Sequence, residues 1–497
     1  MPPAGPGPVG APPVGQGAGG GPRRDLTQGP IGRTLLLFAL PTLGSNILQS
    51  LNGSINAIWV GNFLGEGALA ATSNANIIMF LMFGAVFGFG MAATVMVGQR
   101  FGARDAEGAR RAFGAALGLV TGAAVVIATL GWVFAPEILR VLATPPEAFD
   151  FALAYLRVIF LGLPPSMVVV LISMALRGTG DSVTPLWFMG LTVVIDASLN
   201  PLLILGIGPF PRMGIAGSAA ATLIANVVTV AALTWHIQAR DLPIRLRDAE
   251  RRFVLPSAEL TRLIVSKGVP IGAQMIVIST SALTMIGLVN REGVITTAAY
   301  GVTQQLWAYV QMPALAIGAA VSAMAAQNIG AGKWDRVGAI TRSGIIYNLL
   351  LTGTTIALLL LFDIPVLALF LGEGSAALPL ARHIQVVATW GFLMFGATMV
   401  MLGTVRANGA VLVPLLILFV SVFPVRIGFA VAATPMLGVD ALWLSFPVGF
   451  ASTLVLASLY YRFGGWRQAG PMQVPAREAE EHAHATVEPG GVLKPTG

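Results

Sequence analysis

Apolar residues run through most of this chain in long stretches that only short polar segments interrupt. A helix needs about 20 apolar residues to cross a hydrocarbon core of about 30 Å. On that rule the sequence predicts twelve membrane-spanning helices in two groups of six, and therefore an all-α membrane protein. The predicted spans are 34–60, 68–98, 110–134, 151–176, 184–206, 215–237, 265–289, 296–326, 343–362, 383–405, 412–433 and 441–462.

Three polar segments frame the two groups of spans. Residues 1–30 are rich in Pro and Gly, residues 239–262 are rich in Arg, and residues 464–497 carry no long apolar run. We expect a six-helix N-terminal lobe over 31–238 and a six-helix C-terminal lobe over 263–463, joined by a linker at 239–262. The composition of the two ends is typical of disordered tails.

The composition excludes several classes of protein. Hydrophobic residues make up 55% of the chain and charged residues only 10%, whereas soluble domains carry about 25% charged residues. The absence of cysteine excludes disulfides and thiolate metal sites. Of the four histidines, His482 and His484 lie in the predicted tail, where a solvated side chain is the better explanation than a metal site. We expect no metal and no cofactor.

The basic residues predict how the chain is oriented. Lysine and arginine accumulate on the cytoplasmic side of membrane proteins. With the N-terminus inside, most of the 29 lysines and arginines fall in the predicted inside segments, including the linker 239–262. We therefore expect an inner-membrane protein with both termini cytoplasmic. The net charge of +7 then follows from topology, and no nucleic-acid partner is needed to explain it.

The two halves of the chain repeat each other. Gln99 and Gln327 occupy equivalent places in GMAATVMVGQRFGA and GAAVSAMAAQNIGA, and the pattern R-x-x-G-x-x-x-x-P occurs at 177–185 and again at 406–414, at almost the same offset. Since six is an even number, both halves enter the membrane in the same orientation. Such parallel repeats are typical of transporters that work by alternating access.

Several motifs in order along the chain resemble the multidrug and toxic compound extrusion (MATE) family. They are IWVGNFLGEGALAA, GQRFGARD, RGTGDSVTP, LNPLLILGIGPFPRMGIAGSA and GVDALWLSFPVGF, and the resemblance extends over roughly residues 31–462. It implies two six-helix lobes around a V-shaped cavity. It also implies export of organic, often cationic, compounds in exchange for protons or sodium ions.

One carboxylate lies deep in the predicted membrane region. Asp196 falls about twelve residues into the fifth span, some 18 Å along a helix, close to the midplane. A charged group at that depth costs on the order of 3 kcal/mol, so it is a functional candidate by default. Desolvation favours the neutral form of a carboxyl group, and we therefore expect Asp196 to exchange protons.

Amide and hydroxyl side chains accompany Asp196. Asn200 lies one helical turn further on, and Gln49, Asn52 and Asn56 share one face of the first span. Such groups must turn away from lipid, so we expect a polar pocket in the N-terminal lobe. Other candidates for its lining are Thr222, Asn226, Asn74 and Asn76. For the last three, a purely structural role in holding helices together is an equal alternative.

The resemblance also bears on the coupling ion. Proton-coupled members of the family look as if they carry an Asp in the first helix and an Asn-x-x-x-Asp pair in the fifth. Here Asn56 stands at the first position, and the pair is reversed as Asp196 and Asn200. Sodium-coupled members resemble one another in carrying carboxylates in the C-terminal lobe, and spans seven, eight, ten and eleven contain none here. We favour H⁺ over Na⁺ as the coupling ion.

The C-terminal lobe offers aromatic and methionine side chains that are able to line a cavity for organic compounds. Trp307 and Met312 are the main candidates, because Trp can hold cations over its face and Met adapts to varied shapes; Tyr309, Trp390 and Met394 join them, and a lipid-facing position is an equal alternative for the whole group. Arg157 and Arg426 lie within reach of the outer surface, where arginine can snorkel. The alternative for these arginines is a partner for an anionic group inside the lobe.

Taken together, these features predict a secondary active exporter of amphipathic organic cations, working as a monomer in the lipid bilayer. The alternative is a flippase or exporter of a lipid-linked or anionic metabolite on a related fold. No Walker-type GxxxxGK[ST] sequence occurs, so ATP is not the direct energy source. A membrane enzyme is disfavoured because no acidic or histidine cluster lies at a membrane edge.

Overall fold

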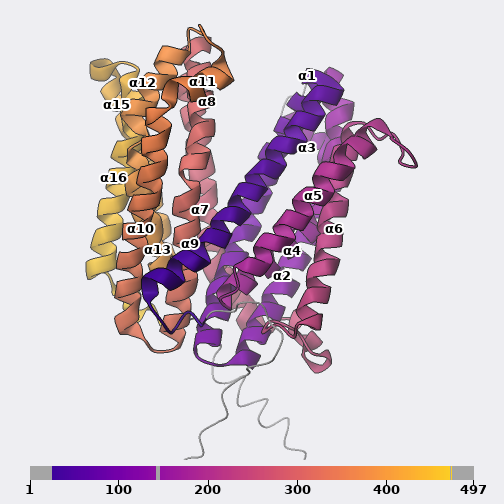
Figure 1. The fold of residues 1–497 in the computed structure, drawn as a ribbon, viewed down its shortest axis with the longest axis vertical. Helices are drawn as coiled ribbons and strands as arrows, with labels where there is room; N and C mark the ends of the chain where they lie inside the picture. Colours follow the sequence, from indigo (N-terminus) through magenta and orange to yellow (C-terminus); the bar gives the residue numbers. More distant parts are fainter. Residues whose placement is uncertain (1–24, 142–145, 471, 473–497) are drawn as a thin grey trace, which may run out of the picture.

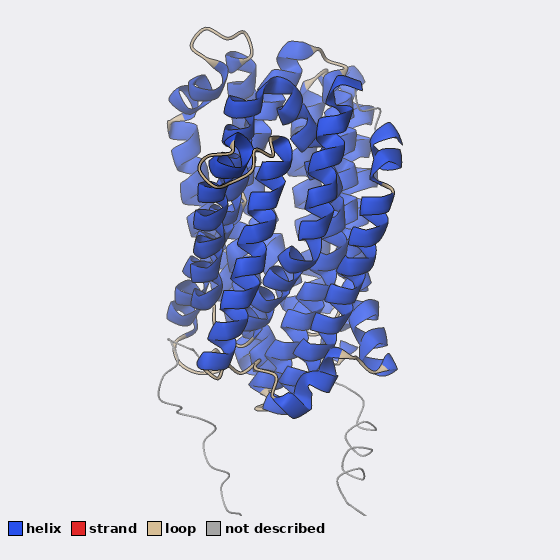
Figure 2. Ribbon diagram, turned by 90° about the vertical axis from the view of Figure 1, so that its right-hand side faces the viewer, coloured by secondary structure: helices blue, strands red, loops and turns tan. Residues whose placement is uncertain are grey.

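The structure is a computed structural model that describes residues 25–141, 146–470 and 472, without the side chains of 65–83, 85, 86, 141 and 146–148. Within those residues it consists of helices and their connecting loops (Figure 2). The side chains of Asn74 and Asn76, and both His482 and His484, lie outside the described residues.

The first helical segment, α1 (Ile31–Gly102), crosses the molecule twice. A hydrogen bond joins the backbone N–H of Leu26, just before α1, to Gln327 Oε1 at 3.3 Å. At the other end of α1, Gly102 lies directly against the carbonyl group of the same Gln327. Because both ends meet one residue, α1 must run out and back, and Figure 1 shows this course. It therefore supplies the first two predicted spans.

Four further long helices complete the N-terminal lobe with α1. Asp105 caps the first of them, because its Oδ1 accepts a hydrogen bond from the N–H of Gly108 at 2.8 Å. The helices of this lobe after α1 are α2 (Ala106–Val133), the short α3 (Ala135–Val141), α4 (Pro146–Gly178), α5 (Val183–Leu205) and α6 (Ile215–Ala239).

The linker between the lobes is packed on the N-terminal lobe through its short helix η1 (Asp248–Val254). Gly114 of α2 approaches Phe253 so closely that a Cβ on it would lie 2.7 Å from Phe253 Cβ, and Gly118 meets the backbone of Val254 even more closely. Gly114 and Gly118 thus leave room for the linker on the surface of α2. The next helix begins at Ala258, within the last residues of the predicted linker.

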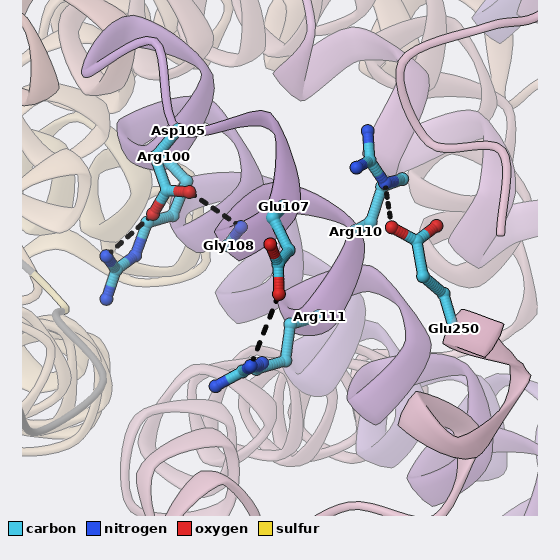
Figure 3. Close-up of polar contacts among 7 residues, drawn as sticks. All are labelled: Arg100, Asp105, Glu107, Gly108, Arg110, Arg111 and Glu250. Carbon is cyan, nitrogen blue, oxygen red and sulfur yellow. Dashed lines mark hydrogen bonds and ion pairs between the residues drawn. The ribbon is translucent and has the colours of Figure 1, made fainter. Parts of the chain in front are cut away.

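Ion pairs reinforce this docking and the start of α2 (Figure 3). Arg110 Nε lies 2.8 Å from Glu250 Oε1, and both side chains are mostly buried. Arg100 at the end of α1 pairs with the capping residue Asp105 at 3.0 Å. The linker and the α1–α2 turn are therefore fixed parts of the lobe rather than solvated connections.

The C-terminal lobe repeats the six crossings with several interrupted helices. The fourth crossing of this lobe bends by 46° between its two helices, and the fifth contains a π-helical stretch around Pro424. Pro424 lacks a backbone donor, which explains the distortion of the fifth crossing. The helices are α7 (Ala258–Asn290), α8 (Val294–Val310), α9 (Met312–Gly330), α10 (Trp334–Leu361), α11 (Asp363–Leu371), α12 (Leu378–Ala388), α13 (Gly391–Ala407), α14 (Leu412–Val420), η2 (Ser421–Ile427), α15 (Gly428–Leu437), α16 (Asp440–Phe463) and η3 (Gly465–Ala469).

The two lobes form a V, as predicted. They meet at the end of the molecule where residues 25–30 and 464–472 lie, which we call the narrow end, and they diverge toward the opposite, wide end (Figure 1). With α1 counted twice, α8 and α9 as one crossing, and α12 and α13 as one bent crossing, the described helices supply the twelve predicted spans.

Reciprocal hydrogen bonds join the lobes at the narrow end. Gln99 Nε2 of the N-terminal lobe donates to the carbonyl oxygen of Ala407 at 2.6 Å, and Gln327 Nε2 of the C-terminal lobe donates to that of Gly178 at 2.8 Å. The two glutamines are equivalent in the internal repeat, as are the two carbonyl groups. The duplication therefore produces a pseudo-twofold contact, in which each lobe holds the end of a helix of the other.

Both chain ends complete this contact. Gln327 Oε1 accepts from Leu26, as described above, and Gln99 Oε1 accepts from the N–H of Met472 at 2.7 Å. Leu26, Trp466 and Met472 are all buried. Residues that the sequence places at the inner ends of the two predicted tails, among them Leu26, Trp466 and Met472, are therefore buried parts of the bundle.

Candidate functional site

Asp196 lies in the middle of α5 and is fully buried. Two asparagines of α1 donate to its Oδ2, Asn52 Nδ2 at 2.8 Å and Asn56 Nδ2 at 3.0 Å. The i, i+4 spacing of these asparagines places both amides on the same face of α1. The first arm of α1 is therefore attached to the carboxylate through two successive turns.

Two more side chains complete the shell around the carboxylate. Thr222 Oγ1 of α6 lies 3.1 Å from Asp196 Oδ1, and Asn200 Nδ2 lies 3.1 Å from the same oxygen. Asn200 Nδ2 also lies 2.9 Å from Asn56 Oδ1, which links the shell across α1 and α5. Four side chains from three helices thus meet at one acid.

The local sequence of α5 positions this acid. Pro201 follows Asn200 and removes a backbone donor from the helix one turn after the carboxylate. The Asn200 side chain bonds back to the carbonyl group of Asp196 at 3.3 Å. Gly206, with φ 72°, ends the helix in the left-handed region that glycine tolerates best.

The charge of Asp196 is solvated by dipoles alone within the described part of the chain, since the ion pairs found there do not include it. Two acceptor atoms beside it, Asn52 Oδ1 and Asn200 Oδ1, are buried and have no donor. The site therefore has an excess of acceptors, which suits a proton or a small cation bound by oxygen ligands.

Other predicted site residues lie at the edge of this network or outside it. Asn226 is buried and donates to the Thr222 carbonyl group at 2.9 Å, so it packs one turn from the site without touching the carboxylate. Gln49 is exposed and makes none of the contacts to Asp196. No cluster of three or more His, Cys, Asp or Glu side chains occurs among the described residues that would suit a metal ion.

The C-terminal lobe has an aromatic core in place of a second acidic site. Trp307 is buried in it, with Nε1 donating to Thr389 Oγ1 at 2.8 Å. Met312 is half-buried at the start of α9, whereas Tyr309 and Trp390 are exposed. Of the predicted aromatic lining, Trp307 is therefore a core residue.

Both arginines of the spans stack on aromatic rings. Arg157 lies 4.8 Å from the ring centre of Trp132, and Arg426 lies 3.7 Å from that of Phe446. The Nε atom of each is buried without a partner in the described structure. The buried side chains of Gln385 and Thr389, which are linked by hydrogen bonds to Trp307, were not predicted from the sequence, although their i, i+4 spacing marks one helix face.

A twelve-helix bundle of two duplicated lobes around a buried acid defines a membrane transporter of the two-lobe class. The chain belongs to the MatE family, whose profile matches residues 41–202 and 270–432. It is a multi-pass membrane transporter and not an enzyme.

The comparisons also identify individual relatives. The probable multidrug resistance protein YoeA of Bacillus subtilis is 36% identical over 433 residues, which cover 87% of this chain and 93% of that protein. A FAD transporter of Shewanella oneidensis is 28% identical over 324 residues, 63% of this chain and 69% of that protein. Among solved structures, an outward-facing multidrug resistance MATE transporter superposes with a TM-score of 0.80 at 20% identity, over 89% of this chain and 98% of that one.

Proposed function

We propose that this protein exports amphipathic organic cations across the inner membrane in exchange for ions, with Asp196 as the coupling site. The observation that carries the proposal is the buried carboxylate held by four polar side chains and by no cation among the described residues. The name of the Bacillus subtilis relative supports a role in drug efflux.

Protonation of Asp196 gives a direct route from ion binding to helix movement. An ionised carboxylate only accepts hydrogen bonds, whereas the protonated acid also donates one. At least one of the donors Asn52, Asn56, Asn200 and Thr222 must then turn away or accept instead. Because these side chains come from α1, α5 and α6, the proton changes how the three helices pack. A ligand that favours one arrangement of a two-state protein biases its equilibrium.

The arrangement of the amides favours a proton over sodium. The nitrogen atoms of Asn52, Asn56 and Asn200 are directed at the carboxylate. A sodium ion requires oxygen ligands there instead, so at least two amides would have to turn over. A proton requires only one of the four donors to turn away or accept instead.

The basic residues of the narrow end indicate how the protein is oriented in the membrane. That end carries basic residues of the α1–α2 turn and of the linker, such as Arg100 and Arg110, and the positive-inside rule then makes it cytoplasmic. Both termini lie on the same side, and the V opens to the outside. An impermeant maleimide tests this with an Asp248→Cys variant, because the chain has no cysteine and the Asp248 side chain is 93% exposed. Labelling in intact cells contradicts the proposed orientation.

Dye uptake into everted membrane vesicles, driven by an imposed pH gradient and separately by a sodium gradient, tests the function. We expect uptake of a cationic dye with the pH gradient and none with the sodium gradient. Asp196→Asn keeps the size of the side chain and is expected to abolish this uptake. Asp363→Asn is the matched control, since Asp363 pairs with Arg382 at 2.7 Å and takes no part in the proposed coupling. Gradient-driven uptake by Asp196→Asn at the wild-type rate refutes the proposal.

The alternative function is export of an anionic metabolite. It is favoured by one comparison, the relative from Shewanella oneidensis whose name is FAD transporter. Competition by anionic compounds in the same vesicles distinguishes the two functions: inhibition of dye uptake by flavin nucleotides, but not by organic cations, favours the alternative.

We also propose that the transporter acts as a monomer, because each chain contains both lobes. A monomer mass in detergent, measured by light scattering, is the expected result.

A further inference from the structure

Buried donor atoms without acceptors gather in the C-terminal lobe. Three of them are Arg426 Nε, Trp443 Nε1 and Gln385 Nε2, each buried and without a hydrogen-bond partner in the part of the chain that the structure describes. All three atoms carry hydrogen and can only donate. A buried polar group left without a partner costs about 1–3 kcal/mol. Three such donors together indicate a missing acceptor.

Aromatic contacts place these donors around one cluster. The guanidinium carbon of Arg426 lies 3.7 Å from the ring centre of Phe446, and the ring centres of Phe446 and Trp307 are 4.7 Å apart. Trp443 is fully buried and stacks on Tyr300 at 5.8 Å. Tyr300 in turn contacts Phe446 at 6.2 Å. The rings thus connect Arg426 to Trp443 within one continuous group.

Gln385 joins the same group through a chain of hydrogen bonds. Trp307 Nε1 donates to Thr389 Oγ1 at 2.8 Å, and Thr389 Oγ1 donates to Gln385 Oε1 at 2.6 Å. These bonds fix the orientation of the Gln385 amide, so its nitrogen is the atom left free. The helices α8, α12, η2 and α16 therefore all contribute to the cluster.

The backbone around Arg426 is built to hold this arginine inside the lobe. Arg426 belongs to the π-helical stretch η2, and single π-helical turns occur frequently at functional sites. Across from it, a Cβ at Gly449 would lie 2.9 Å from Arg426 Cβ, so glycine leaves the space that the arginine stem occupies. In this conformation the guanidinium of Arg426 lies over the ring of Phe446.

The described residues offer no acid to neutralise Arg426. Two acids of the C-terminal lobe are already engaged near the wide end: Asp363 with Arg382 at 2.7 Å and Asp440 with His383 at 2.8 Å. The Asp196 site of the N-terminal lobe has the opposite imbalance, with a buried carboxylate and the free acceptors Asn52 Oδ1 and Asn200 Oδ1. The two sites thus differ in the sign of the ligand that each can satisfy.

We propose that the cluster around Arg426, Trp443 and Gln385 binds an oxyanion carried by the transported compound, such as a carboxylate, while the aromatic rings contact its apolar part. The favoured cargo is then amphoteric, with a cationic and an anionic group, rather than a simple organic cation. This inference rests on the proposed function as an exporter of organic compounds. The geometry requires small side-chain movements to admit the anion, because the donors are covered in this conformation.

A pair of dyes that differ in one group tests the proposal. Rhodamine B carries a free carboxylate and a delocalised cation, and its ethyl ester keeps the cation and the rings but loses the anion. Binding of each dye to the purified transporter in nanodiscs is measured by fluorescence anisotropy, independently of transport. We expect the wild type to bind rhodamine B more tightly than the ester. Arg426→Met, which keeps an unbranched apolar stem, is expected to weaken rhodamine B binding about tenfold or more, since charged hydrogen bonds contribute about 1.5–3 kcal/mol.

Two variants serve as controls for this experiment. Arg157→Met removes an equally orphaned arginine from the other lobe and is expected to leave both affinities within twofold. Trp443→Phe keeps an aromatic ring but removes one donor, so it tests the proposal even if Arg426→Met fails to fold; we expect a loss of about threefold for rhodamine B only. Equal affinity of the wild type for both dyes, or equal losses for both in Arg426→Met and in Trp443→Phe, overturns the proposal. Failure of the proposed function gives a different result: both dyes bind with the expected preference, but no ion gradient drives either across the membrane.

Discussion

Replacing Gln99 with alanine removes two hydrogen bonds from the narrow end in a single step. The side chain donates to Ala407 O at 2.6 Å across the lobes and accepts from the N–H of Met472 at 2.7 Å. Gln99 is 3% exposed, so the variant leaves a buried carbonyl group and a buried N–H unsatisfied. Each lost bond contributes about 1 kcal/mol, and each orphaned group costs up to a few kcal/mol. When the lobes separate at this end, water can replace both bonds.

Gln99→Ala therefore destabilises the conformation described here without destabilising the one in which the narrow end is open. We expect Gln99→Ala to shift the equilibrium by about 2–3 kcal/mol toward a state in which the narrow end is open, which is roughly 30- to 140-fold. Gln327→Ala is expected to act in the same direction, because Gln327 makes the equivalent bonds to Gly178 and Leu26. Its bond to Leu26 is longer, at 3.3 Å, so its effect is expected to be the smaller of the two.

Distances between two spin labels measure this equilibrium. Glu107 at the start of α2 and Asp335 at the start of α10 are exposed, occupy equivalent places in the two lobes, and can be labelled in a chain without other cysteines. We expect the longer of two distance populations to grow in Gln99→Ala, at a pH where the parent shows both. Gln274→Ala is the matched control, since this buried glutamine contacts Arg406 within its own lobe. Unchanged populations in both Gln99→Ala and Gln327→Ala refute the reasoning.

Further predictions concern the acid, the linker and the wide end. Asp196→Asn combined with Asn200→Asp moves the carboxylate by one turn, about 5.4 Å, along the same helix face. We expect the double variant to recover part of the pH-driven dye uptake that Asp196→Asn loses. Uptake no better than that of Asp196→Asn alone contradicts a site shared by the two positions. Gly118→Val is expected to displace the linker and make residues 240–257 sensitive to trypsin in the folded protein. Gly122→Val is the matched control, because no atom lies within 4 Å of a Cβ there, and equal sensitivity of the two variants contradicts linker docking. Asp363→Asn is expected to lower the melting temperature while leaving the ratio of uptake with and without a pH gradient unchanged.

Much of the fold follows from the sequence because lipid imposes simple rules. A spanning helix must be long and apolar, and an internal repeat of six such helices leads directly to two equivalent lobes. The same rules located the polar site, since Asp196 and the amides of α1 are too costly to face lipid. The structure brings Asn52, Asn56, Asn200 and Thr222 onto that acid, as their helical spacing predicts.

The positions that could not be predicted depend on contacts between distant segments. Gln49 shares a helix face with Asn52, yet its side chain is exposed and is not among the described partners of Asp196. The buried positions of Leu26 and Met472 depend on acceptors more than 300 residues away in the sequence. Composition alone therefore could not identify the buried residues at the edges of the predicted tails.

The internal repeat explains why the glutamines at the lobe contact recur in both halves of the sequence, whereas Asp196 and Arg426 do not. Gln99 and Gln327 recur in both halves because the pseudo-twofold contact needs the same residue on each side. Asp196 and Arg426 have no such counterparts, and on our proposals each serves a ligand that only one lobe binds. Symmetry thus marks the residues that join the lobes, and departures from symmetry mark those that give each lobe its chemistry. On this argument, the acceptor-rich site of the N-terminal lobe and the donor-rich cluster of the C-terminal lobe are the places where two copies of one scaffold acquired different ligands.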